Sequence, residues 1–102
     1  MSSQRRTSTR IVDLHTLGRD LLEQGAYPDA ARALQRRLRL APGDREARYL
    51  LGIATLGLGQ PDQALVSFEQ VVAEHAGDEL AALAKARLED ISSYPVKDSR
   101  AL

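Results

Sequence analysis

The sequence predicts an all-α fold, an antiparallel array of helical hairpins stacked side by side. A pattern of small and polar residues recurs after 34 residues, a period typical of stacked repeat units. Apolar residues between these positions follow the i, i+3, i+4, i+7 spacing of helices. Aromatic residues make up only 4% of the chain, so Leu, Val and Ala must build the core. The recurring pairs are Gly18 and Gly52, Gly25 and Gly59, Ala30 and Ala64, and Asp44 and Asp78.

The composition argues against an enzyme. The chain of 102 residues has room for one domain and contains no cysteine, which excludes a disulfide framework, a thiolate nucleophile and a Cys-type zinc site. His15 and His75 are the only histidines, and no further metal ligands stand at helical spacing from either. Asp44 and Asp78 are interpreted as helix caps. We therefore expect no catalytic residues, no metal and no cofactor.

The first helical hairpin is predicted over residues 11–44. Its first helix runs from 11 to 24 and is ended by Gly25, which tolerates positive φ. Its second helix begins near Pro28, because proline at a first helical position loses no hydrogen bond, and ends at about residue 40.

The second hairpin repeats this plan over residues 45–78. Asp44 caps a helix at 45–58, and Pro61 begins a helix at 61–74. A last helix at 79–91 caps the array. The remaining segments, 1–10 and 92–102, are predicted to be flexible tails because they hold too few apolar residues to anchor them.

Small residues are expected where the helices approach closely. Glycine inside a helix costs roughly 1 kcal/mol relative to alanine, so Gly18 and Gly52 need a packing reason. Contact between paired helices supplies one. The small residues assigned to such contacts are Gly18, Ala30, Gly52, Ala64 and Ala86.

These positions resemble the tetratricopeptide repeat, whose pattern is W-x2-L-G-x2-Y, then A-x3-F, then P. The departures from this pattern include Arg48 for the usual Trp, Thr55 for Tyr and Arg37 for a small residue. In the first copy the matching residues are Leu14, Leu17, Gly18, Leu21, Ala30, Leu34 and Pro42. In the second copy they are Arg48, Leu51, Gly52, Thr55, Ala64, Phe68 and Ala76.

The resemblance implies two repeats plus a C-terminal capping helix in a right-handed superhelix. The first helix of each pair would line a concave groove that holds a peptide or helix from another protein. Exposed apolar surface of this kind marks interaction sites. An interaction module or adaptor is therefore the predicted function. The residues expected in the groove are Val12, His15, Arg19, Leu22, Tyr49, Ile53, Leu56, Leu83 and Arg87.

Two alternatives stay open. Residues 1–51 carry ten bases and six acids, and residues 52–102 carry four bases and eight acids, so the +4 end of one copy could meet the −4 end of another in a homo-oligomer. The other alternative is a small chaperone for a secretion substrate, as in some bacterial relatives of this family. The family's chaperone-binding carboxylate clamp is not expected, because Leu50, Leu80 and Ala84 offer no donors.

A basic stripe is expected on the convex side, formed by Arg32, Arg36 and Arg39 at i, i+4 and i+7. The simplest interpretation is that this stripe is a helix face exposed to solvent. Binding to an acidic partner is the alternative. Nucleic acid is not an expected partner because aromatics are scarce and the net charge is zero.

No signal peptide or membrane span is evident, so we expect a cytoplasmic protein.

Overall fold

The computed structural model describes residue 14 and residues 16–92, and it confirms the all-α prediction. Helices and the turns between them account for this part of the chain, without a strand. The second hairpin's last helix spans 61–74 as predicted, whereas Ser92, predicted to begin the tail, is the final residue of the capping helix. The helices are 16–23, α2 (Tyr27–Leu40), α3 (Arg45–Gly57), α4 (Pro61–Glu74) and α5 (Glu79–Ser92).

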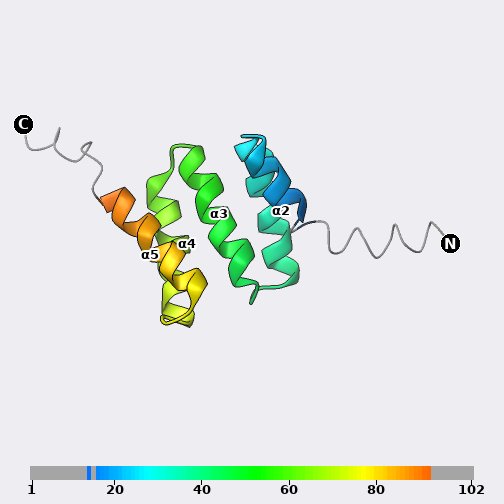
Figure 1. Ribbon diagram of the computed structural model, residues 1–102. Helices are drawn as coiled ribbons and strands as arrows, with labels where there is room; N and C mark the ends of the chain where they lie inside the picture. The colour runs from blue at the N-terminus through cyan, green and yellow to red at the C-terminus, as the bar shows by residue number, and fades with distance from the viewer. Residues whose placement is uncertain (1–13, 15, 93–102) are drawn as a thin grey trace, which may run out of the picture.

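The helices stack in chain order (Figure 1). α3 packs against α2 on one side and α4 on the other, and α4 packs against α5. α3 also contacts α5 directly, while Arg19 of the first helix pairs with Glu46 of α3. The first helix, α3 and α5 therefore form one layer, and α2 and α4 form the layer behind it.

The turns that close the two hairpins are the same structure, 34 residues apart. Gly25 and Gly59 have φ of 78° and 77°, a left-handed conformation that glycine adopts without strain. The next residue's N–H then bonds back to the helix, Ala26 to the Leu21 carbonyl at 2.8 Å and Gln60 to the Thr55 carbonyl at 2.9 Å. These bonds satisfy carbonyls that a helix end leaves without partners.

The predicted close contacts within each hairpin are confirmed. A Cβ placed on Gly18 would lie 2.6 Å from Leu34, and one on Gly52 would lie 2.6 Å from the Phe68 ring. Ala30 and Ala64 are fully buried. The assignment of Ala86 was wrong, because its side chain is exposed. α5 has no helix beyond it in the described residues, so its outer side faces solvent.

Most of the core lies between the second hairpin and α5. Phe68 and Val71 are fully buried there, in a cluster that also contains Tyr49, Ala64, Ala84 and Ile91. A smaller cluster around Ala30, Ala31 and Ala54 joins the two hairpins, which fixes the relative position of the repeats.

Leu17 matches the Leu-Gly position of the repeat pattern, and 45% of it is exposed. Its counterpart one repeat later, Leu51, is half-buried against the cluster that joins the hairpins. The difference arises because α2 covers Leu51, whereas among the described residues no helix precedes the one that carries Leu17.

None of the described helices is long and apolar enough to cross a bilayer.

Candidate protein-binding face

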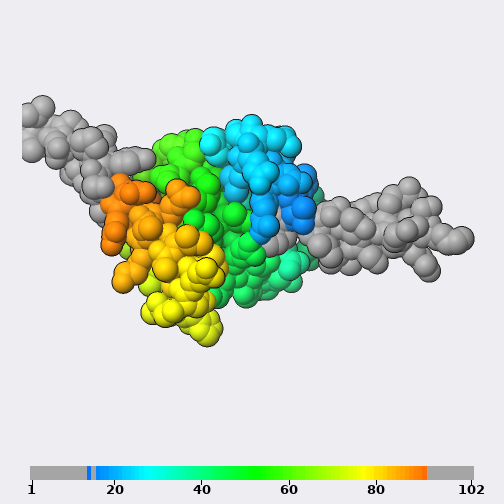
Figure 2. Space-filling view, in the orientation of Figure 1, coloured from blue at the N-terminus to red at the C-terminus, as the bar shows by residue number. Residues whose placement is uncertain are grey.

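The predicted groove residues within the described part of the chain lie on the layer formed by the first helix, α3 and α5, here called the three-helix face. Figure 2 shows this side of the molecule, with α3 between the first helix and α5. Val12 and His15 lie outside the described residues. The remaining predicted residues are Arg19, Leu22, Tyr49, Ile53, Leu56, Leu83 and Arg87.

The apolar floor of the three-helix face is only partly accessible. Leu22, Ile53 and Leu56 are half-buried, because each also packs against a core cluster. Leu83 of α5 differs from them, with 50% of its surface exposed. Among the predicted groove residues that are described, Leu83 is the most accessible large apolar side chain, and with Ile53 and Leu56 it would form an apolar patch of the kind that marks interaction sites.

Tyr49 is not part of the accessible floor, contrary to the prediction. It is 9% exposed, and its ring lies 5.5 Å from the Phe68 ring, centroid to centroid, at a tilt of 56°. Its hydroxyl accepts a hydrogen bond from Nε of Arg87 at 3.2 Å. Tyr49 therefore belongs to the core and positions Arg87 on the face.

A second polar contact on the three-helix face joins the first helix to α3. Arg19 of the first helix donates to the Glu46 carboxylate of α3 in an ion pair. Both side chains are about half exposed, at 48% and 46%, so the pair contributes little stability by itself. Together the Arg19–Glu46 and Arg87–Tyr49 contacts connect α3 to the first helix and to α5. They place charged side chains at the edges of the apolar floor.

The two arginines that depart from the family pattern have structural partners. Arg37 donates from Nε to the Asp44 carboxylate at 2.8 Å. Arg48 donates to the Pro42 carbonyl at 2.5 Å and to the Glu74 carboxylate at 3.1 Å. Neither arginine is part of the apolar floor. The sequence pattern could not reveal these contacts, because the partners belong to turns and helix ends whose positions depend on the stack.

Both predicted caps are confirmed. Asp44 accepts from the Ala47 N–H at 3.0 Å, and Asp78 accepts from the Ala81 N–H at 2.9 Å. Hydrogen bonds from Arg45 and then from the Ala81 N–H hold the pKa of Asp78 below its ordinary value, since they favour the charged carboxylate. These carboxylates stabilise the beginnings of α3 and α5.

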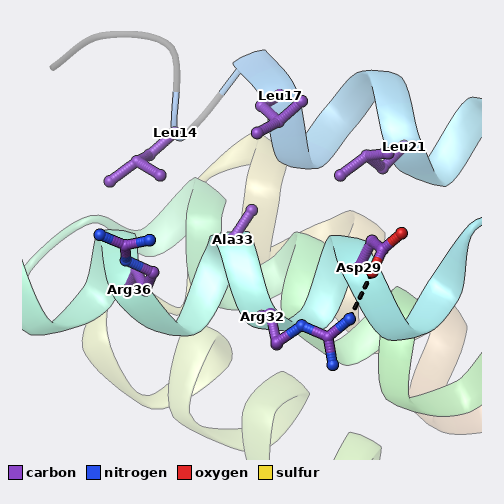
Figure 3. Close-up of a pocket in the computed structure, with 7 residues that line it drawn as sticks. All are labelled: Leu14, Leu17, Leu21, Asp29, Arg32, Ala33 and Arg36. Atoms are coloured by element: carbon purple, nitrogen blue, oxygen red, sulfur yellow. Dashed lines mark hydrogen bonds and ion pairs between the residues drawn. The ribbon is translucent and has the colours of Figure 1, made fainter. Parts of the chain in front are cut away.

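The three arginines of the predicted basic stripe are exposed on α2. Arg32 and Arg36 line a groove of about 340 Å³ between the first helix and α2 (Figure 3). This end groove lies on the flank of α2 opposite the residues that pack toward α3. Arg39 is exposed and is not among the lining residues. The groove is lined by Leu14, Leu17, Leu21, Asp29, Arg32, Ala33 and Arg36.

No group of three or more His, Cys, Asp or Glu side chains in the described residues is arranged to hold a metal ion.

Comparison with known proteins agrees with the fold. The family model described as tetratricopeptide repeat matches residues 21–88, which is two thirds of the chain. The protein therefore belongs to the tetratricopeptide repeat family, whose repeats are generally modules for binding other proteins. Comparison with curated proteins and with solved structures gives no match.

Proposed function

We propose that this protein is a non-catalytic interaction module that binds a peptide or helix of another protein on its three-helix face. Leu83 carries the proposal, because half of this large apolar side chain is exposed on the layer where the family binds its ligands. Ile53 and Leu56 of α3 extend the apolar floor beside it.

The charged borders indicate the chemistry of the ligand. Arg87 is exposed and held by Tyr49, so it can receive a carboxylate without losing much side-chain freedom on binding. A ligand with one or two apolar anchors for the floor and an acidic residue toward Arg87 fits this surface. An amphipathic helix presents such residues at i, i+3 and i+4.

The test is a selection of helical peptides from a displayed library against the intact chain, followed by measurement of Kd by calorimetry. Leu83→Glu places a charge in the apolar contact, and we expect it to weaken binding by at least about tenfold. Val66→Glu is the matched control, because Val66 is similarly exposed at 55% but lies on α4, in the other layer. It should leave Kd unchanged.

Circular dichroism of both variants establishes that they fold. Equal loss of binding in Leu83→Glu and Val66→Glu, or unchanged binding in both, would contradict the assignment of the three-helix face. An Arg87→Ala variant then tests whether Arg87 receives an acidic residue of the ligand. It should weaken the binding of peptides that carry an acidic residue more than the binding of peptides that do not.

A further inference from the structure

The end groove is an apolar surface that the proposed function does not use. Leu17 lies in it with 45% of its surface exposed, beside Leu14, Leu21 and Ala33. Figure 3 shows these leucines on one side and Arg32 and Arg36 of α2 on the other. The groove thus combines an apolar floor with a cationic border.

The internal repeat indicates what kind of element fits there. Thirty-four residues after Leu17 stands Leu51, and that surface is covered by α2, with Ala30 and Ala31 in the cluster that Leu51 joins. The end groove is the same surface one repeat earlier. Its natural occupant is therefore a helix that presents small residues.

The charge of the groove restricts the occupant further. Arg32 is paired with Asp29, but within the described part of the chain no ion pair is formed by Arg36. A helix that carries acids is favoured there. The protein's own residues 2–10 do not fit, because they contain three arginines and no large apolar residue.

The opposite end of the molecule offers such a helix. On α5, Ala82 and Ala86 are exposed, and so are Glu79 and Asp90. Residues 79, 82, 86 and 90 lie on one side of a helix by their spacing. That side is opposite the one that packs on α4 through Ala81 and other buried residues. It is a narrow surface of small residues with acids at its ends.

We propose that the end groove of one copy receives the outer side of α5 from a second copy. The contact is heterologous, since two different surfaces meet, and so it joins chains head to tail into open filaments or closed rings. Because opposite charges meet in it, low salt strengthens it. The proposal does not rest on the proposed function, since the end groove is not part of the three-helix face and Leu83 only adjoins the outer side of α5.

The test is sedimentation of the full chain over a range of protein concentrations, at salt of about 20 mM and about 500 mM. We expect the average mass to rise above 11.2 kDa with concentration at low salt and to fall back at high salt. Arg36→Glu should keep the chain monomeric because it places a carboxylate in the groove, which repels the acidic side chains of α5. Ala86→Arg should do the same because its bulk holds α5 out of the groove.

Mixing the two variants is the decisive step. Arg36→Glu retains an intact α5 and Ala86→Arg retains an intact end groove, so together they form one native contact. The mixture should give complexes of two chains and none larger, which also shows that neither variant is misfolded. A native chain that stays monomeric at every concentration would overturn the proposal. Association that persists in both variants, or that is lost in Val66→Glu instead, would overturn it too.

Discussion

Arg45 and Asp78, 33 residues apart, join the start of α3 to the start of α5. The guanidinium donates to both carboxylate oxygens, at 2.5 and 3.3 Å, and also to the Val71 carbonyl at 2.7 Å. Asp78 is at the same time the cap that receives the Ala81 N–H. One carboxylate therefore orders the beginning of the capping helix and fixes it to the second repeat.

This arrangement predicts an acid-sensitive contribution to stability. The pKa of Asp78 is lowered from its ordinary value of 3.8, so the contribution is fully present above 3.8 and is lost as the pH falls through the lowered pKa. Asp78→Asn keeps an acceptor for the Ala81 N–H but removes the charge. Urea unfolding of both proteins between about pH 5 and about pH 2 should show a shallower decline for the variant. Identical pH profiles would contradict this role of Asp78.

Gly52→Ala should destabilise the fold although alanine is the better helix former. The new Cβ would lie 2.6 Å from the ring of Phe68, which is fully buried and cannot move aside freely. Overpacking of this kind costs about 1–3 kcal/mol, which exceeds the gain in helix propensity of roughly 1 kcal/mol or less. Thermal and urea unfolding measure the effect.

Gly77→Ala is the matched control for that substitution. A Cβ on Gly77 would meet no atom within 4 Å, and its φ is not positive. Its stability should stay within about 0.5 kcal/mol of the native chain. A Gly52→Ala protein as stable as Gly77→Ala would contradict the close approach of α3 and α4.

Arg48→Ala should cost about 1–2 kcal/mol, because it removes hydrogen bonds to the Pro42 carbonyl and the Glu74 carboxylate. Only 16% of the Arg48 side chain is exposed. Arg39→Ala, at an exposed position, should change the free energy of unfolding by less than about 0.5 kcal/mol. Equal effects of the two substitutions in urea unfolding would show that Arg48 has no special structural role.

The sequence predicted the parts of this structure that depend on local chemistry. Proline at residue 61 and glycine at residue 59 determined where a helix begins and a turn closes, and both predictions are confirmed. The two aspartate caps are confirmed for the same reason. Each depends on the conformational preference of one residue or on a hydrogen bond to a near neighbour.

The sequence was a poorer guide to which side chains are buried, above all at the two ends of the helical stack. Leu17 and Ala86 match buried positions of a repeat, yet both are exposed, because among the described residues no helix covers them. Tyr49 lies on the predicted helix face but is buried beneath Arg87. A periodic pattern identifies the face of a helix, whereas the burial of a side chain depends on what lies across from it.

The central claim, that the three-helix face binds the partner, is tested most directly by NMR. The amide spectrum of the chain is recorded while a library-selected peptide is added, and the perturbed residues are mapped. The account predicts perturbations centred on Ile53 and Leu56 of α3 and on Leu83 and Arg87 of α5. Perturbations confined to α4, or to the end groove around Leu17 and Arg36, would contradict it.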